Sequence, residues 1–506
     1  MINVSRNLEN FVFNLEKAKN YFFENIKDME AAVHIYTHID ADGLASGAIL
    51  GKALYREKIP FQITVLKQLE REEILRIANK EINNFIIFSD FGSGQYLELQ
   101  DKLKKNGQTL PFLILDHHIP QDVANKEELE TLKEIHQKTR PWHINPYFYN
   151  IDGSIEISGA GMCYYFVKCL NENNVDLSPV AIVGAIGDIQ NKGPNKTFLG
   201  LNSLIMGEAK NNNYIDLMDD LNFSLIKPLN EAIAYSTEIN LPGLTKDINK
   251  TLKFLQTLGI LMEDSDGNIK TLKDINQDDK QKLSSAIIEF ATVKLGIEPI
   301  EIINKLIIKR YLIKNDVGYS NLYDSNEFSS TLNACGRTNN ASLGIAVAMG
   351  DRKNAFQQIK EINLKYRQSL HQSLLWIKEN NKIQQKENIQ YFFGEDIIPE
   401  NIIGVIASIL IFDKSDLIDL SKPIFGIATR EDEDVYKISG RAHESLVKKG
   451  VNLSEAIRVT LELTNLDSLN GGGHPPAAGG KIPINKIDIF LENCNKVVKK
   501  QLESKI

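Results

Sequence analysis

The stretch AAVHIYTHIDADGLASG, residues 31–47, joins an apolar run to three polar side chains at alternate positions, His38, Asp40 and Asp42. The apolar run predicts a buried strand. Side chains of a strand alternate between its faces, so the three point to one side, like ligands facing one cavity, if the extended backbone persists. A second interpretation is that Asp40 and Asp42 only cap a helix that starts near Gly43, since aspartate is a good cap. This motif alone leaves both interpretations open.

Three more apolar runs follow: FQITVL (61–66), NNFIIFSD (83–90) and PFLILDHH (111–118). Segments with the apolar spacing of helices separate these runs. Strands that alternate with helices predict an α/β domain built on a parallel sheet with crossover helices.

Carboxylates and imidazoles recur where these runs end. Asp90 ends one run, Asp116, His117 and His118 end the next, and Asp188 follows the small residues of VAIVGAIG. In open α/β sheets, ligands bind at the carboxyl ends of the strands, and neither solubility nor capping explains such a set. The pattern therefore predicts a site for two metal ions.

The residue types also narrow the metal and the chemistry. Carboxylate and imidazole ligands without thiolates favour Mn²⁺ or Mg²⁺, imidazole favours Mn²⁺ of the two, and Co²⁺ and Zn²⁺ remain compatible. Two such ions generate a nucleophile at neutral pH and neutralise the oxygens of a phosphoryl group under attack. Hydrolysis of a phosphoester is the predicted reaction.

Length and composition set wider limits. The 506 residues are enough for two or three domains. No apolar run is as long as a membrane span, and the N-terminus lacks the apolar core of a signal peptide, so we expect a cytoplasmic protein with no membrane contact. The four cysteines form no CxxC pair, which argues against a disulfide framework and a thiolate zinc site. A net charge of −8 still allows a basic channel for nucleic acid.

The character of the sequence changes twice along the chain. Residues 1–222 carry the alternating runs described above, whereas 223–326 are rich in Lys, Glu, Ile and Leu with little strand signal and predict a mostly helical inserted or connecting domain. Residues 327–506 predict connecting helices and then a second, smaller α/β domain with the strands NIQYFFG, KPIFGIATR and VYKISGRA.

Four motifs resemble, in order, those of the DHH phosphoesterases: HIDADG (38–43), SDFGSG (89–94), LDHH (115–118) and GAIGD (184–188). The resemblance implies an N-terminal DHH domain, a C-terminal DHH-associated domain that binds substrate, and an active site in the cleft between them.

The resemblance extends beyond the catalytic domain. LNACGR (332–337) is similar to the Asn-Ala-x-Gly-Arg motif of the RecJ single-strand exonucleases, and IIGVIASIL (402–410) resembles the helix that follows it. KISGRA (437–442) and GGGHPPAAGG (471–480) resemble the substrate-gripping segments of the DHH-associated domain. Together the motifs span residues 38–480.

Metal-ligand roles follow from the matching positions. One ion would be held by His38, Asp40 and Asp90, and the other by Asp42, Asp90, His117 and Asp188. Asp90 would bridge the two ions. By the same resemblance Asp116 would orient the histidines, and His118 would contact the scissile phosphate.

Substrate-binding roles follow in the same way for Asn333, Arg337, Ser439, Arg441, Gly472, Gly473 and His474. Glycines let backbone amides approach an anion, and a histidine donates to phosphate. Arg441 lies two residues after Ser439 on one face of a predicted strand and could fork a phosphate. Arg337 would guide the strand toward the metals. The simpler alternatives are a tight turn for the glycine segment and an exposed arginine on a strand.

The resemblance to archaeal RecJ-like nucleases implies a Mn²⁺-dependent exonuclease, with Mg²⁺ or Co²⁺ as substitutes. It would degrade single-stranded DNA from the 5′ end, and RNA as a further candidate, in replication or repair, with the GINS complex as candidate partner. One alternative is a phosphodiesterase for short oligonucleotides, nucleoside bisphosphates or cyclic dinucleotides. Another is a replication scaffold. The helical block and the motif at 332–337 favour the polynucleotide substrate, and the complete ligand set favours an enzyme.

Overall fold

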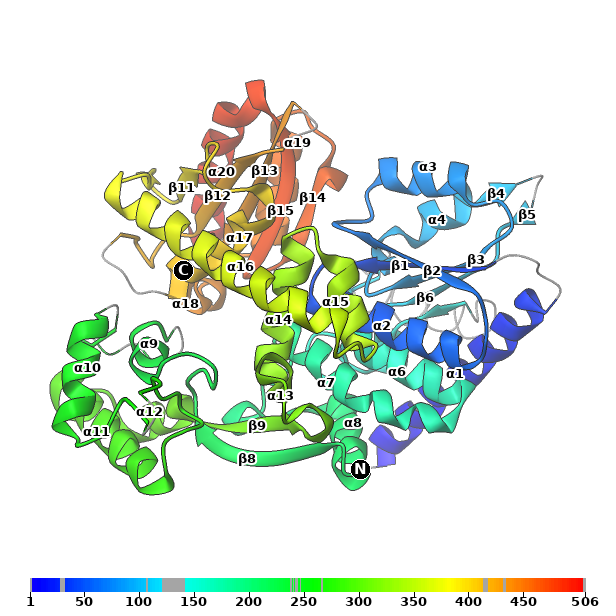
Figure 1. Ribbon diagram of the computed structural model, residues 1–506. Coiled ribbons are helices and arrows are strands. Elements are labelled where there is room, and N and C mark those ends of the chain that lie inside the picture. Colours follow the sequence, from blue (N-terminus) through cyan, green and yellow to red (C-terminus); the bar gives the residue numbers. More distant parts are fainter. Residues whose placement is uncertain are drawn as a thin grey trace. The chain divides into compact units, whose positions relative to one another are not determined.

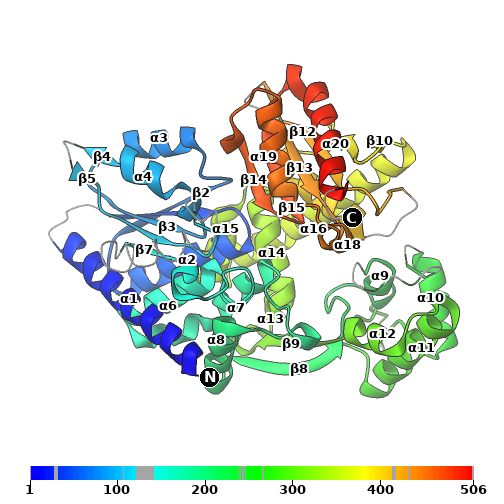
Figure 2. The same cartoon turned by 180° about the vertical axis from the view of Figure 1, so that it is seen from behind.

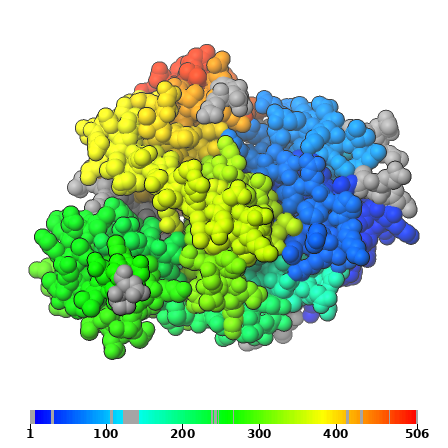
Figure 3. All heavy atoms as spheres, in the orientation of Figure 1, coloured from blue at the N-terminus to red at the C-terminus, as the bar shows by residue number. Residues whose placement is uncertain are grey.

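The computed structural model describes residues 2–503 except 28–31, 106–107, 121–141, 237–238, 240, 242–243, 246, 265–266, 413–416 and 431–433. The chain divides into two compact units, Met1–Ala234 with Lys246–Asn363, and Tyr235–Thr245 with Leu364–Ile506. Figure 1 and Figure 2 show their elements from two sides, and Figure 3 shows the atoms of the first view. A membrane-spanning helix is not found among the residues that the structure describes.

The first unit is built on a parallel five-stranded sheet with the strand order β2-β1-β3-β6-β7. Its strands are β1 (Val33–His38), β2 (Phe61–Leu66), β3 (Phe85–Ser89), β6 (Phe112–Leu115) and β7 (His143–Ile144). The four predicted apolar runs are therefore strands, and the parallel sheet is confirmed. Because Thr37 pairs with Ser89 and Ser89 with Leu115, the carboxyl ends of the three central strands meet at one edge.

Helices cover both faces of this sheet, as strands buried on both sides require. Val33 and Ile35 face α1 (Ile2–Ile26), α2 (Ala41–Arg56), α6 (Gly159–Leu170) and α7 (Ser178–Gly187) in one apolar core. Tyr36 and Phe88 pack in a second core with α3 (Arg71–Lys80) and α4 (Tyr96–Lys102). A short hairpin of β4 (Lys104–Lys105) and β5 (Gln108–Thr109) follows α4.

A mostly helical region is inserted after α8 (Gly200–Asn211) and belongs to the same unit. Its helices are α9 (Leu229–Ala234), α10 (Ile248–Thr257), α11 (Gln277–Leu295) and α12 (Pro299–Leu306). The antiparallel pair β8 (Ile215–Leu221) and β9 (Ile307–Ile313) flanks them (Figure 1). The chain continues through α13 (Ser320–Tyr323), α14 (Ser325–Arg337) and α15 (Ala341–Ala348).

Strand β9 is a strand that the sequence pattern of this region did not indicate. Arg310 stands in the middle of the strand yet is buried, because its guanidinium donates to Asp324 at 2.7 Å and to the backbone carbonyl of Leu221 at 2.5 Å. A buried cation breaks the apolar pattern by which a strand is recognised. The prediction of a mostly helical region is otherwise confirmed.

The second unit contains a six-stranded mixed sheet in the order β10-β11-β12-β13-β15-β14. Its strands are β10 (Gln384–Gln385), β11 (Gln390–Phe393), β12 (Ile424–Thr429), β13 (Val435–Arg441), β14 (Gly471–His474) and β15 (Ala477–Pro483). Its helices are α16 (Asn354–Glu379, which begins in the first unit), α17 (Glu400–Phe412), α18 (Glu444–Lys448), α19 (Leu453–Leu463) and α20 (Ile487–Glu503). One core joins Phe425 and Ile438 to α19 and α20, and another joins Phe392 and Ile424 to α17. The predicted second α/β domain is confirmed.

Candidate metal centre

Acidic and imidazole side chains from four elements converge at the carboxyl edge of the first sheet. His38 is the last residue of β1, Asp90 follows β3, His117 follows β6, and Asp188 caps the carboxyl end of α7. The ligand atoms form three overlapping groups, each within 4.8 Å: His38, Asp40 and Asp90; Asp42, His117 and Asp188; and Asp90, Asp116, His117 and His118. The structure thus brings together all six side chains predicted as metal ligands.

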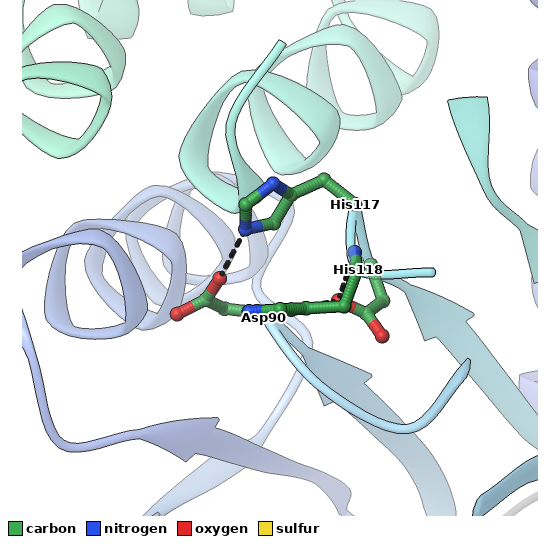
Figure 4. A group of neighbouring side chains, drawn as sticks. Asp90, His117 and His118 are labelled. Atoms are coloured by element: carbon green, nitrogen blue, oxygen red, sulfur yellow. Dashed lines mark hydrogen bonds and ion pairs between the residues drawn. The ribbon is translucent and has the colours of Figure 1, made fainter. Parts of the chain in front are cut away.

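Asp90 connects the first two groups through its two oxygens. Its Oδ2 lies 3.6 Å from Nδ1 of His38, and its Oδ1 lies 3.2 Å from Nε2 of His117. Figure 4 shows the carboxylate and the imidazole pointing toward each other. Nε2 of His117 also lies 3.7 Å from Asp42 and 3.6 Å from Asp188. One carboxylate is therefore placed to serve two neighbouring cations.

The extended backbone does not persist through the first motif, so the condition for placing all three side chains on one face of a strand is not met and the capping interpretation holds for Asp40. Strand β1 ends at His38, and Asp42 lies in the first turn of α2. Asp40 is the N-cap of that helix, since its Oδ1 accepts from the amide of Gly43 at 3.0 Å, while its Oδ2 lies 3.0 Å from Nδ1 of His38. Capping and a place in the cluster are therefore compatible functions of one side chain.

Backbone amides hold Asp42 in place. Its two oxygens accept from Gly159 at 2.7 Å and from Ala160 at 2.9 Å at the start of α6, where amides and the helix dipole favour a negative charge. A Cβ at Gly159 would lie 2.5 Å from Oδ1 of Asp90, so only glycine fits there. The sequence prediction missed this support, although the Ser158 cap before two small residues is a recognisable helix start.

The backbone of Asp90 is left-handed, with φ of 63°. Aspartate tolerates this region better than most residues because its short side chain bonds locally. The conformation occurs directly after β3, while the amide of Asp90 still bonds to the carbonyl of Leu115 at 3.0 Å. The turn bends the chain so that the carboxylate points into the cluster instead of continuing along the strand.

His117 presents a defined nitrogen to the cluster. Its Nδ1 lies 2.6 Å from the carbonyl of Gly153, which can only accept, so Nδ1 carries a proton and Nε2 is the nitrogen that faces the carboxylates. Within the described residues, Nε2 of His117 and Oδ1 of Asp90 are buried and make no hydrogen bond, although they face each other at 3.2 Å as an ion pair. Buried polar atoms are rarely left so.

The pKa values of the carboxylates in the cluster also favour a bound cation. Burial, together with the neighbouring carboxylate of Asp90, raises the pKa of Asp42 well above its ordinary value. Burial and the same neighbour also raise the pKa of Asp188. Burial would lower the pKa of His117, but the same carboxylates raise it. Crowded carboxylates beside an imidazole nitrogen fit divalent cations that take oxygen and nitrogen ligands.

Asp116 is directed at His118. Its Oδ1 accepts from Nδ1 of His118 at 2.8 Å, and its Oδ2 accepts from the amide of Ser93 at 2.8 Å. Burial alone would raise the pKa of Asp116, but His118 and the Ser93 amide hold that pKa below its ordinary value. Asp116 therefore fixes the ring of His118, as the resemblance implied for orientation. Asn145, which the sequence prediction missed, donates to the carbonyl of His118 at 2.8 Å.

Three family models match the chain: the DHH family N-terminal domain over residues 32–187, the DHH-CID domain over 225–307 and the DHHA1 domain over 388–500. An uncharacterized protein of Methanocaldococcus jannaschii is 34% identical over 491 residues, which cover 96% of this chain and 98% of that protein. The chain belongs to the DHH phosphoesterase superfamily.

Solved structures of similar fold include RecJ from Thermus thermophilus in complex with Mn²⁺, with a TM-score of 0.56 and 15% identity. That comparison covers 96% of this DHH protein and 55% of the RecJ chain, so the chain spans about half the length of that relative. CDC45 from Entamoeba histolytica has a TM-score of 0.64 and 12% identity, covering 96% and 99% of the two chains. At these identities the likeness concerns the fold.

The segment predicted to guide substrate packs against the first DHH motif. Asn333, on α14, accepts from the amide of Ala41 at 3.2 Å and so helps to cap α2. A Cβ at Gly336 would lie 1.8 Å from the carbonyl oxygen of Ile39, so the two backbones touch. Arg337 ends the same helix, and its charge acts with the closer His38 to lower the pKa of Asp40 against the effect of burial. The substrate contacts of Asn333 and Arg337 stay predictions.

A cavity of about 440 Å³ opens next to this segment in the first unit. Its lining residues are Ile39, Ile63, Val65, Lys67, Gly336, Asn339, Ala341, Ser342 and Ile345. Ile39, which lies between His38 and Asp40 in the sequence, is the lining residue next to the metal-ligand candidates along the chain.

The DHHA1 domain places its predicted residues in two groups. Ser439 and Arg441 share one face of β13, as expected, and both lie near Gly404 of α17. Arg441 donates to Oγ of Ser408 at 2.8 Å. A contact of this face with phosphate stays a prediction.

The glycine segment belongs to a hairpin. Gly472, Gly473 and His474 lie in β14, which pairs with β15 at the edge of the sheet, and the tight turn of the segment falls at Pro475 and Pro476. An edge strand keeps one row of backbone groups outside the ladder. Recognition of phosphate by these residues stays a prediction.

Proposed function

We propose that this DHH protein is a two-metal, Mn²⁺-dependent phosphodiesterase that hydrolyses single-stranded nucleic acid from an end. The observation that carries the proposal is the pair of ligand groups joined by Asp90. His38 and Asp40 would complete one site, and the group of Asp42, His117 and Asp188 would complete the other. Divalent cations bound there would supply Lewis acidity and a nucleophile at neutral pH.

The protein's own groups would position the reacting phosphate. Asp116 fixes Nδ1 of His118, and the family resemblance assigns the contact with a phosphoryl oxygen to this ring. The amides of Gly159 and Ala160 hold Asp42, and the carbonyl of Gly153 holds His117, so the ligands are ordered before substrate binds. Such preorganisation is a main source of stabilisation of the transition state.

A polynucleotide substrate is supported by the segment at 332–337, whose resemblance is to the RecJ exonucleases and whose backbone lies against Ile39. Arg337 would neutralise a phosphate as the strand enters, and the adjoining cavity offers room for a nucleotide. Fold likeness to RecJ solved with Mn²⁺ supports this cation. The direction from 5′ to 3′, a role in replication or repair and the GINS complex as partner rest on the family resemblance and on the likeness to RecJ and CDC45.

The test uses a DNA strand and an RNA strand of one sequence, each labelled at either end, in Mn²⁺. A blunt duplex, a dinucleotide and a nucleoside bisphosphate are run beside them. Mononucleotides released from the 5′ end of the single strand, with poor cutting of the duplex, are the expected result. Consumption of only the small substrates would establish the small-substrate alternative. No cleavage by protein that has bound two Mn²⁺ ions would favour a scaffold.

A further inference from the structure

A buried glutamine adjoins the metal centre at the carboxyl end of α7. Gln190 is fully buried, and its Nε2 donates to Oδ2 of Asp188 at 3.0 Å and to the carbonyl of Gly153 at 2.9 Å. The same carbonyl accepts from Nδ1 of His117 at 2.6 Å. One amide group therefore contacts a predicted ligand and the anchor of another.

The orientation of this amide is determined by its neighbours. Asn202, on α8, donates to Oε1 of Gln190 at 2.7 Å, so that oxygen faces a donor. The two hydrogens of Nε2 then face two acceptors, Asp188 and Gly153, which uses the full donor capacity of a side-chain amide. The reverse orientation would place Oε1 against a carboxylate and a carbonyl.

Asn202 is itself unusual for a core position. It is fully buried, and among the described residues its Oδ1 lacks a hydrogen-bond partner. A buried carbonyl without a partner is unfavourable, so an apolar side chain would suit the packing better. The amide of Asn202 donates a hydrogen bond to Gln190, which an apolar residue at this position could not do.

We propose that Gln190, oriented by Asn202, is a positioning residue for only one of the two cation sites, that of Asp42, His117 and Asp188. The proposal rests on the proposed two-metal centre. Its selectivity follows from the contacts: Nε2 of Gln190 donates to Asp188, lies 3.4 Å from Nδ1 of His117, and shares the carbonyl of Gly153 with that ring. The group of His38, Asp40 and Asp90 is held instead by the cap of α2 and the turn after β3.

The experiment measures Mn²⁺ binding to the full chain by calorimetry and electron paramagnetic resonance. Wild-type protein should bind two ions that couple through their shared carboxylate. Gln190→Ala should weaken one site about 10- to 100-fold, as changes behind metal ligands do, and leave the other unchanged. Gln190→Glu keeps the size of the side chain but removes both donors and should weaken the same site at least as much. Lys192→Ala, on the same turn and exposed, is the matched control and should change neither site.

Asn202→Ala provides the second measurement, and it serves if Gln190→Ala does not fold. It should weaken the same site less than Gln190→Ala, and the double variant should be no weaker than Gln190→Ala, because both act through one contact. Two unchanged sites, or equal weakening of both, in Gln190→Ala would overturn the proposal. Wild-type protein that binds two ions and cleaves no phosphodiester would refute the proposed function while leaving this binding test valid.

Discussion

Two buried polar clusters of the first unit use the same residue types and differ in how completely those residues are paired. In the cluster around Glu81, His34 lies 2.5 Å from Oε1 of Glu81 and 2.7 Å from Oγ1 of Thr64. Tyr36 and Asn84 also donate to Glu81, each at 2.6 Å. In that cluster both carboxylate oxygens of Glu81 accept hydrogen bonds from side chains of the protein itself.

In the metal centre, by contrast, Oδ1 of Asp90 and Nε2 of His117 are buried and make no hydrogen bond among the described residues, and their closest ion pair is the 3.2 Å contact between them. The pKa values differ in the same sense. Burial would raise the pKa of Glu81, but its hydrogen bonds from His34, Tyr36 and Asn84 lower it to about 2, whereas burial and Asp90 raise the pKa of Asp42. A buried polar cluster whose hydrogen bonds are all made within the protein stabilises the fold. A buried cluster with polar atoms that make none is typical of a site that binds a ligand.

The largest effect should come from the carboxylate that joins the two ligand groups. Asp90→Asn keeps the side-chain size and tolerates the left-handed backbone, but it removes the charge shared by two sites. We expect kcat to fall by about a thousandfold or more, because several kcal/mol of transition-state stabilisation depend on the bound cations. Stability in EDTA should change little, because Asp42 and Asp188 lose a like-charged neighbour while His38 and His117 lose an ion-pair partner. Turnover in Mn²⁺ and urea unfolding in EDTA measure the two quantities, and normal turnover would remove Asp90 from its assigned role.

The converse result is expected for the paired cluster. Glu81→Ala leaves His34, Tyr36 and Asn84 without their acceptor in the interior. The free energy of unfolding should fall by about 3 kcal/mol, since unpaired buried donors are costly. Mn²⁺ binding and kcat of the folded protein should stay unchanged. Loss of kcat in this variant with unchanged stability would erase the distinction between the clusters.

Stability should also respond to pH in opposite directions in the two clusters. The raised pKa values of Asp42 and Asp188 mean that metal-free folded protein retains protons that the unfolded chain releases, so their contribution falls as pH rises above about 4. Burial would raise the pKa of Glu81, but hydrogen bonding lowers it to about 2. The stability that Glu81 contributes is therefore complete above its ordinary pKa and is lost as pH falls from there toward about 2.

Mn²⁺ competes with protons only in the metal centre, which makes this difference measurable. Saturating Mn²⁺ should stabilise the protein by about 2 to 3 kcal/mol at about pH 7 and by less at about pH 5. Thermal unfolding with Mn²⁺ or EDTA at both pH values gives the comparison. Asp90→Asn should lose the Mn²⁺ effect, and an equal effect at both pH values would contradict the assignment.

The smallest effect concerns backbone strain beside Asp188. Ile189 occupies the position after the cap of α7 with φ of 56°, where glycine or asparagine is usual. Ile189→Gly should raise the free energy of unfolding by about 1 kcal/mol, because a left-handed backbone strains a β-branched residue. Asn213 holds the corresponding position after α8 with φ of 62°, so Asn213→Gly is the control and should gain little. Chemical denaturation of both variants decides between strain relief and a packing role for Ile189.

The sequence was sufficient for the parts of the fold that rest on contiguous patterns. The apolar runs before Asp90 and His117 predicted parallel strands and the edge at which their ligands meet. The helix cap at Asp40 is one of the two interpretations that the sequence left open. The buried Arg310 was harder, because alternation does not describe a cation paired inside a sheet.

The supporting residues could not be predicted for a different reason. Gln190 and Asn202 are single amides without a spacing rule, and their partners lie 37 and 12 residues away along the chain. Such contacts are defined only by the folded packing of α7 and α8. The six metal-ligand candidates were predictable because the motifs that carry them are short and ordered.

The bond between Asn333 and Ala41 spans 292 residues and closes the first unit around the helical insertion. During synthesis, every ligand candidate up to Asp188 leaves the ribosome before Asn333 does. At ordinary elongation rates the delay is on the order of ten seconds. A newly made chain therefore has the opportunity to acquire its cations before the segment that would guide a nucleic acid has been translated, so metal loading can precede exposure to substrate.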